Sequence, residues 1–287
     1  MNYKDPHNKE NLIRAKNNLI SDLSIYLDEL IAGDEHQYKE AAILYYSLTD
    51  RLNYFKLEPT FNPKYLPSYA RGNLIKANFG YNVGSEFGGL HYCIVLHESN
   101  QQNPIASVLP LTSNKGRLYK SDINLGDEMY SLLMSKIKNT KIEIKKQSKQ
   151  LSQTINRSND IADKLFSLVK IEGFSIDENS FDLLGAAFYG SPQLKNLLKN
   201  VSTITKDFKF QLNELQQTKK SLDQTSREIS KMKEGSIGII NQIRPISKMR
   251  IYKPKSKNDA LYNISISDDT LDTINEKLSQ YYLKPYK

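Results

Sequence analysis

A candidate for proton transfer in this 287-residue chain is His91, which closely follows the glycine-rich segment GYNVGSEFGG. Histidine can donate or accept a proton near neutral pH. Glu86, within that segment, could take a proton or orient His91, although a carboxylate on a surface loop is more often only solvated. A histidine beside this loop could therefore do acid–base chemistry, and a strand-edge histidine with no catalytic role is the alternative.

Aromatic side chains in this loop, and basic side chains further along the chain, could bind a nucleic acid. Tyr81 and Phe87 could stack on unpaired bases, or they could pin the loop onto the barrel. Lys115 and Arg117 follow a later apolar segment and could form a track for phosphates. The net charge of +8, from 40 basic and 32 acidic residues, fits a polyanionic partner. Lysine-rich chains also occur without such a partner, so charge alone leaves both interpretations open.

Composition excludes several other classes of protein. The single cysteine, Cys93, cannot form an internal disulfide and is expected to be a packing residue rather than a nucleophile. The sequence has no compelling metal-binding constellation, so we expect neither a metal nor another cofactor. The longest uncharged run, residues 183–194, is too short to span a bilayer, and the amino terminus lacks the apolar stretch of a signal peptide. We therefore expect a cytoplasmic protein without a membrane partner.

Two groups of short strand-like segments must position these side chains. Residues 69–125 and 235–287 contain runs of strand composition separated by turns, many of which carry glycine. The second group ends in an amphipathic helix that Ser267 or Asp268 would cap. Several short strands of this kind predict an α+β fold built on a small antiparallel barrel or sandwich.

Helices are expected before and between these groups. Residues 1–60 show helical spacing on both sides of Gly33 and should form a helical hairpin. In residues 126–234, apolar residues recur every seven positions, whereas the interleaved positions are polar in the middle. Two such helices should pair as an antiparallel coiled-coil arm, each about 60 Å long. The arm would return the chain to its start, so Leu125 and Gly235 should lie close together. Its apolar tip, residues 174–194, could be a cap or a partner-binding knob.

Taken together, the two strand regions resemble the PemK/MazF family of toxin–antitoxin endoribonucleases. Residues 71–75, RGNLI, resemble the family's opening strand R-G-D-[IV], and residues 84–89 match its G-S-E-x-x-G loop. The segment PIASVLPLT, ending at Thr112, is similar to the strand S-P-T-x-x-V-x-x-[IL]-T. Beyond the arm, INQIRPISKMRI resembles D-Q-I-R-x-[IV]-x-x-x-R. The resemblance implies an SH3-like PemK/MazF β-barrel, split by the arm.

The resemblance also implies an activity: cleavage of single-stranded RNA without a metal, by attack of the ribose 2′-hydroxyl on the adjacent phosphate. Thr112 matches the family's catalytic threonine, and His91 stands where the family has an arginine. Histidine can move a proton but lacks the permanently charged fork of arginine. With His91 and Thr112, Glu86 completes the expected catalytic group.

Further residues are expected to contact RNA. Seven side chains make up this group: Ser85, Arg244, Gln242, Lys115, Arg117, Tyr81 and Phe87. A surface ion pair is the alternative role for Arg244.

Partners also follow from the resemblance. Single-stranded RNA would be the substrate and a cognate antitoxin protein the inhibitor, and a homodimer is a possible assembly because family members act as dimers. The replacement of arginine by His91 leaves open a catalytically silent module that holds RNA or a protein such as DNA gyrase. The length of the arm leaves open a third interpretation, in which the arm is the working part and the barrel its scaffold.

Overall fold

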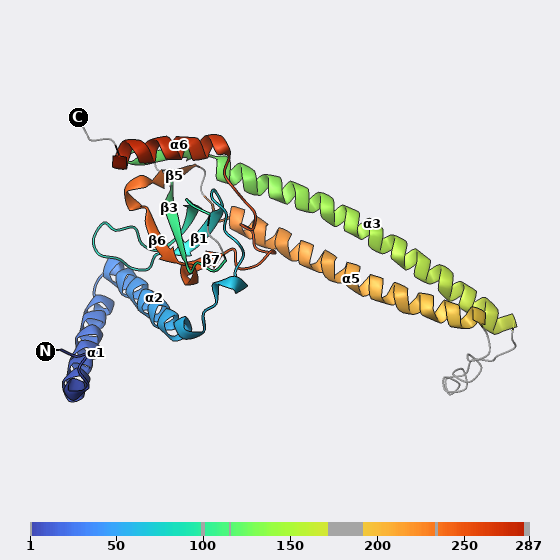
Figure 1. The fold of residues 1–287 in the computed structure, drawn as a ribbon, viewed down its shortest axis with the longest axis horizontal. Coiled ribbons are helices and arrows are strands. Elements are labelled where there is room, and N and C mark those ends of the chain that lie inside the picture. Colours follow the sequence, from blue (N-terminus) through green and yellow to red (C-terminus); the bar gives the residue numbers. More distant parts are fainter. Residues whose placement is uncertain (1, 99–100, 115, 172–191, 233–234, 284–287) are drawn as a thin grey trace.

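The computed structural model describes residues 2–98, 101–114, 116–171, 192–232 and 235–283. Figure 1 shows a sheet near the centre, a pair of N-terminal helices on one side of it and a long helical arm on the other. The protein is therefore α+β, with a mostly antiparallel seven-stranded sheet.

The sheet is assembled from both strand regions. Its strands are β1 (Leu74–Asn78), β2 (Leu90–Val95), β3 (Ile105–Ser113), β4 (Asp122–Gly126), β5 (Ser236–Ile239), β6 (Arg244–Ser247) and β7 (Ile251–Lys253). They run in the order β4-β5-β3-β2-β1-β7, and β6 pairs with β3 outside this path. Within the described ranges no ladder joins β4 to β7, so the sheet is open where we expected a closed barrel. The strand β7 has three residues and is followed by Pro254, which has no N–H to extend a ladder.

Side chains alternate between the two faces of the sheet along each strand. Both faces are buried, each under its own apolar cluster. Leu74, Ile94 and Leu109 belong to one apolar cluster, whereas Ile75 and Cys93 belong to the other. Cys93 is fully buried and unpaired, and this burial raises the pKa of its thiol. The expectation that Cys93 is a packing residue is confirmed.

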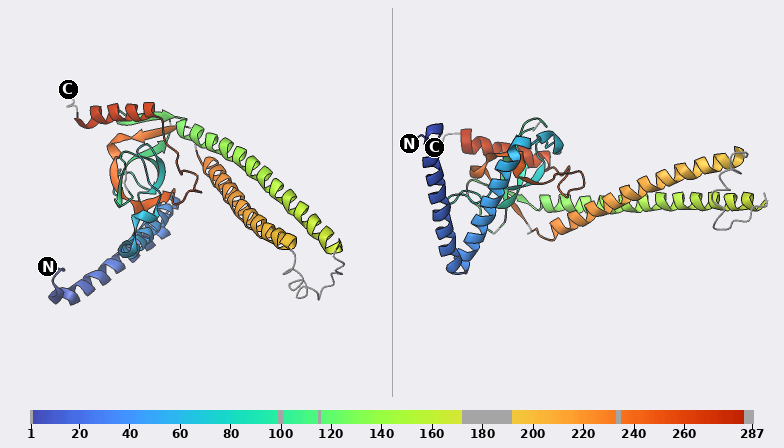
Figure 2. Two further views of the ribbon diagram at one scale, coloured as in Figure 1. Left: turned by 45° about the vertical axis from the view of Figure 1, so that its right-hand side comes forward. Right: turned by 90° about the horizontal axis from the view of Figure 1, so that it is seen from below.

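The arm consists of α3 (Glu128–Ile171) and α5 (Pro192–Ile229), which run side by side (Figures 1 and 2). The chain returns to its point of departure: Gly126 pairs with Ser236 across β4 and β5, and the Gly235 N–H donates to Asp127 Oδ1 at 2.9 Å. The predicted closeness of the two ends is confirmed. The proposed apolar tip lies outside the described residues except for positions 192–194.

The remaining helices are α1 (Lys9–Ala32), α2 (Glu35–Leu57) and α6 (Asp268–Leu278). Asp34 and Gln37 form a capping box that starts α2, and the Ser267 side chain caps α6 as predicted. In the part of the chain that the structure describes, no helix is long and apolar enough to cross a membrane.

Candidate functional site

His91 and Thr112 lie on neighbouring strands and line one pocket. The β2–β3 register pairs Cys93 with Pro110, and extending it by two residues places His91 opposite Thr112. Both side chains line a pocket of about 250 Å³ between the sheet and the base of the arm. The Nδ1 atom of His91 is 3.2 Å from the carbonyl oxygen of Leu111. Because a carbonyl only accepts, Nδ1 carries the proton in this contact.

The same pocket is basic, and the arm forms part of its wall. Lys76 reaches it from β1, and Lys231 and Met232 reach it from the segment that follows α5. Of the described residues that line it, none is acidic, whereas hydroxyl groups come from Thr112 and Ser236, among others. Lysines facing hydroxyl groups in a concave site favour an anion such as a phosphate.

A second pocket, of about 710 Å³, adjoins the first and shares Thr112 and Ser113 with it. It brings together half of the sequence-predicted site residues: Ser85, Phe87, Thr112, Arg117 and Gln242. Tyr119 and Asn241 also line it, and neither was predicted. The glycine-rich loop and the segment before β6 therefore meet at one surface.

Gln242 holds the glycine-rich loop in place. Its Oε1 accepts from the Phe87 N–H at 3.1 Å and from Arg244 Nη2 at 3.2 Å. Phe87 in turn packs its ring 4.3 Å from the ring of His91. Close approach within the loop requires glycine at position 88, where a Cβ would lie 2.7 Å from the Gly80 carbonyl oxygen. The contacts of Gln242 and Phe87 thus fix the surroundings of His91.

Tyr81 lies apart from these pockets. Its hydroxyl donates to Glu40 and its N–H donates to Ser47 Oγ, both on α2, so Tyr81 fastens the loop to α2. The hydrogen bond to Glu40 raises the pKa of Tyr81. Tyr81 therefore pins the loop, but to α2 rather than to the strands as we expected.

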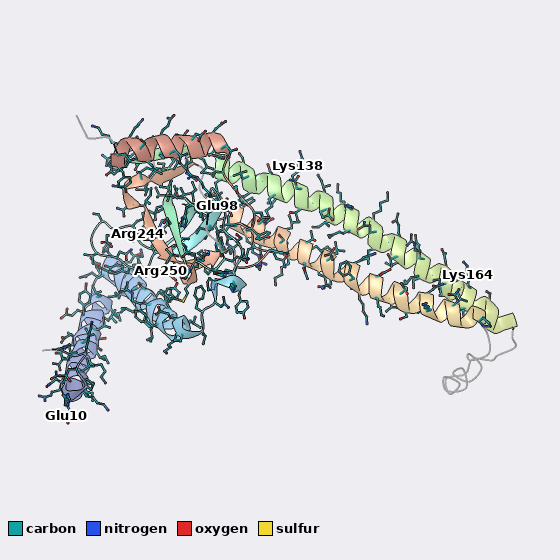
Figure 3. All side chains as sticks on the ribbon, in the orientation of Figure 1. Glu10, Glu98, Lys138, Lys164, Arg244 and Arg250 are labelled. Carbon is teal, nitrogen blue, oxygen red and sulfur yellow. The ribbon has the colours of Figure 1, made fainter. Side chains whose placement is uncertain are left out.

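Three more predicted residues are outside both pockets or cannot be placed. Arg244 donates to Gln242, and its Cζ lies 5.5 Å from the ring centroid of Phe79. Arg244 therefore supports a residue that lines the second pocket without lining that pocket itself. Figure 3 labels Arg244 among the strands. Glu86 is exposed and is not among the described residues that line either pocket. Lys115 lies outside the described residues.

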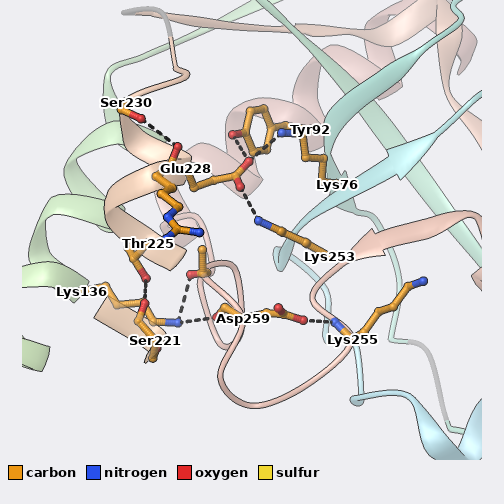
Figure 4. Close-up of polar contacts among 12 residues, drawn as sticks. Lys76, Tyr92, Lys136, Ser221, Thr225, Glu228, Ser230, Lys253, Lys255 and Asp259 are labelled. Atoms are coloured by element: carbon orange, nitrogen blue, oxygen red, sulfur yellow. Dashed lines mark hydrogen bonds and ion pairs between the residues drawn. The ribbon is translucent and has the colours of Figure 1, made fainter. Parts of the chain in front are cut away.

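Glu228 is the main residue that sequence reasoning missed. It is 3% exposed, and its carboxylate accepts from Lys76 Nζ and Lys253 Nζ, each at 2.7 Å, and from the Tyr92 hydroxyl at 2.6 Å (Figure 4). Burial by itself raises the pKa of Glu228, but the three hydrogen bonds outweigh this effect and lower it to about 2. Glu228 therefore ties the last turn of α5 to β1, β2 and β7, and it orients Lys76 beside the pocket.

Lys136 makes a second tie between the arm and the sheet region (Figure 4). Its Nζ donates to the carbonyl oxygens of Asp259, Ala260 and Tyr262, each at 3.0 Å. Burial lowers the pKa of Lys136 to about 8, although the Asp259 carboxylate opposes this shift. The arm is thus bonded both to the strands and to the loop that leads to α6.

Among the residues that the structure describes, no group of three or more His, Cys, Asp and Glu side chains could hold a metal ion. Comparison of the chain with protein-family models and with curated proteins gave no match. The assignment of function therefore rests on the two pockets and on the residues that line them.

Proposed function

We propose that this chain is a PemK/MazF-like toxin of a toxin–antitoxin system, a metal-independent endoribonuclease that cleaves single-stranded RNA. One observation carries the proposal: His91 and Thr112 share a pocket with Lys76 and Lys231, and none of the described lining residues is acidic. A proton acceptor, a hydroxyl donor and two cations are the groups that a 2′-hydroxyl attack on phosphorus requires.

Each residue has a role in this reaction. Nε2 of neutral His91 takes the proton from the ribose 2′-hydroxyl, and the oxygen forms a bond to the adjacent phosphorus. The bond from phosphorus to the 5′ oxygen breaks, that oxygen takes a proton from a solvent water, and a 2′,3′-cyclic phosphate remains. The His91 imidazolium returns its proton to the solvent, so the protons balance. The Thr112 hydroxyl donates to a non-bridging oxygen. Lys76 and Lys231 offset the negative charge that accumulates on the phosphorane-like state.

The adjoining pocket would hold the neighbouring nucleotides. Tyr119, 63% exposed, offers a ring on which an unpaired base can stack, and the exposed Arg117 can contact a phosphate. Phe87 contributes differently, because its ring packs against Phe79 and His91. In this arrangement Phe87 positions the histidine, whereas Tyr119 and Arg117 contact the RNA.

Cleavage of a labelled single-stranded RNA by the full-length protein, in the presence of a chelator, tests the proposal. His91→Ala should lower the cleavage rate by about 10² or more, the usual effect of losing an acid–base group. Thr112→Ala should also lower it, with unchanged circular dichroism. Tyr81→Phe is the control, because it removes a hydroxyl that binds Glu40 and lies outside both pockets. Equal rates in the wild type, H91A and T112A would contradict the proposal.

A catalytically silent RNA-binding module is the second candidate. The contact of His91 Nδ1 with Leu111 and the packing of its ring on Phe87 are also what a purely structural histidine would show. The two candidates differ in one measurement. Wild-type protein that binds the RNA in the assay above, but leaves it intact, would favour the binding module.

A further inference from the structure

A further pocket, of about 580 Å³, lies where the end of α2 meets the sheet, and we call it the α2 pocket. One wall comes from α2 and the turns that follow it, and the other comes from β3, β6 and the turn before β7. A pocket of about 360 Å³ continues it and shares Tyr54, Phe61 and Met249 with it. Neither shares a described lining residue with the two pockets around Thr112. Sites for small organic ligands have volumes of about 300–1,000 Å³, so the α2 pocket has a suitable size.

Contacts between α2 and the sheet hold the two walls of this pocket together. Asp50 Oδ2 on α2 accepts from Asn78 Nδ2 of β1 at 2.6 Å. The Cζ atom of Arg250 lies 5.9 Å from the centroid of the Tyr54 ring, and Figure 3 labels Arg250 where α2 meets the strands. The walls are therefore in place before a ligand arrives, which lowers the cost of ordering them on binding.

Aromatic rings form much of the lining. Tyr54 and Phe61 are half-buried, and Phe55 is 63% exposed at the rim. Ile105 and Met249 add apolar surface from the side of the sheet. Aromatic side chains favour a ring as their neighbour, because stacked or edge-to-face rings bury apolar area and also attract each other through their quadrupoles. The lining therefore favours a ligand that contains an aromatic ring.

Arg250 offers this ligand a fixed pair of donors. Its Nη1 donates to the carbonyl oxygens of Asn78 at 3.4 Å and of Phe79 at 3.0 Å. Among the described residues no other group accepts from Arg250, so Nε and Nη2 remain, and these two atoms form one edge of the guanidinium. Such an edge binds two oxygens of a carboxylate or a phosphate at once. The held guanidinium thus favours an anionic group on the ligand.

The other charges around the pocket also favour an anion. Arg51 is exposed and forms no salt bridge with a described residue. Glu58, at the rim, is the one acid among the described residues that line the α2 pocket. The continuing pocket adds Lys248 and Lys255, and no described acid lines it. Cations therefore outnumber acids, and a concave site of this sign concentrates anions.

We propose that the α2 pocket binds a small aromatic anion, a planar ring that carries a carboxylate or phosphate group. The ring lies against Tyr54 and Phe61, and the anionic group accepts from Nε and Nη2 of Arg250, with Arg51 as a second cation. A free aromatic acid and a nucleotide share this chemistry, and the experiment below separates them. The proposal does not depend on RNA cleavage, because no described residue lines both this pocket and the one that contains His91.

Isothermal titration calorimetry of the full-length protein with naphthalene-2-carboxylate tests the proposal. The neutral naphthalene-2-carboxamide has the same rings without the charge and should bind about tenfold more weakly or worse, because a charged hydrogen bond is lost. Adenosine 5′-monophosphate and adenosine form a second pair of this kind. Displacement of the carboxylate by the monophosphate would assign the site to nucleotides, and binding of the carboxylate alone would assign it to free aromatic acids.

Charge variants at the rim locate the binding site. Arg51→Glu should weaken binding of naphthalene-2-carboxylate by about two- to fivefold, and Glu58→Gln should strengthen it by a similar factor, as is usual for exposed charges. Arg250→Lys keeps the charge but loses the two-atom edge, so it should weaken binding by about tenfold. Arg51 and Glu58 are exposed, so their variants should fold even if the loss of the Arg250 contacts loosens α2.

The matched controls are Arg157→Glu and Phe210→Ala, which change exposed side chains on the arm. Both should bind naphthalene-2-carboxylate as the wild type does, whereas Phe55→Ala should bind it more weakly. Circular dichroism establishes that every variant retains its helices. The proposal would be overturned if neither anion bound at about 1 mM, where even a millimolar complex is half formed. Equal affinities for the carboxylate and the carboxamide, or for the wild type, R51E and E58Q, would also overturn it.

Discussion

At the residue scale, Glu228 connects the stability of the fold to the pocket. Its carboxylate is buried and receives three donors, two of which are lysines that are themselves largely buried. Removing one partner of such an ion pair leaves an uncompensated charge in a poorly solvated place. Lys76 is one of these lysines and also lines the pocket, so the position of this pocket lysine depends on a carboxylate supplied by the arm.

Glu228→Gln should lower the free energy of unfolding at pH 7 by about 3 kcal/mol, since a buried ion pair is broken. The pKa of Glu228 is lowered to about 2 in the folded protein. Its contribution is therefore fully present above the unfolded value, and it is lost as the pH falls through about 4.5 towards 2. Urea unfolding at pH 7 and pH 3 should show a smaller difference between wild type and variant at pH 3.

Glu276→Gln is the matched control, because Glu276 is exposed on α6. It should leave the stability within about 0.5 kcal/mol of wild type, as is usual for surface substitutions. The same loss of stability on acidification in the Glu228 variant as in the wild type would show that other carboxylates cause the dependence.

At the scale of elements, the arm combines an apolar seam with polar layers. Leu133 of α3 is buried in the apolar cluster that it shares with the strands, and Leu215 of α5 is also buried. Further along the arm, Thr154 Oγ1 of α3 donates to Gln211 Oε1 of α5 at 2.9 Å. Gln147 Oε1 is buried and has no hydrogen-bond partner among the described residues. A buried acceptor without a partner lowers stability, because its desolvation is not compensated. These layers are the polar middle that the seven-residue pattern indicates.

Gln147→Leu should therefore stabilise the arm by about 1 kcal/mol, because it replaces the unpaired acceptor with an apolar group. Thermal unfolding followed by circular dichroism at 222 nm, a helix signal, measures the change. Gln153→Leu is the control, because Gln153 is exposed on the same helix. Equal melting temperatures for wild type and Q147L would mean that the unpaired acceptor of Gln147 does not lower the stability of the arm.

At the scale of the whole molecule, the arm and the sheet share a core. Met129 and Leu133 of α3 are buried in the same apolar cluster as Leu74 and Ile274, and Met232 packs against it. The seven-residue pattern alone suggests that residues 127–233 can be removed as a unit. The core contacts show that such a deletion would also remove part of the core, together with Glu228 and Lys136.

Deleting only residues 148–217, and joining Gln147 to Thr218 through a short Gly-Ser turn, should leave a folded protein whose RNA chemistry is unchanged. Deleting residues 127–233 should abolish cooperative unfolding, because buried apolar side chains and the Glu228 ion pairs are lost. Urea unfolding followed by tyrosine fluorescence compares the two, since the chain has 18 tyrosines and no tryptophan. Failure of the short-armed protein to fold would show that the distal arm stabilises the sheet.

The sequence by itself determined the local elements. The segments of strand composition at residues 73–79 and 91–97 became β1 and β2, and the seven-residue pattern became α3 and α5. These periodicities reflect which face of each segment is buried, and a short window of sequence contains that information. Ser85, Thr112 and Gln242 were each singled out from the sequence, and in the fold they line one pocket.

Only the tertiary structure decided the rest. Lys76 meets Glu228 across 152 residues, and their contact depends on where the arm ends relative to β1. Tyr81 pins its loop to α2 and not to the strands, because α2 docks beside that loop. Whether the sheet closes depends on its two edge strands reaching each other, which no local pattern encodes. The physical reason is common to all three: the energy of each contact depends on a relative position in space that the separate segments do not specify.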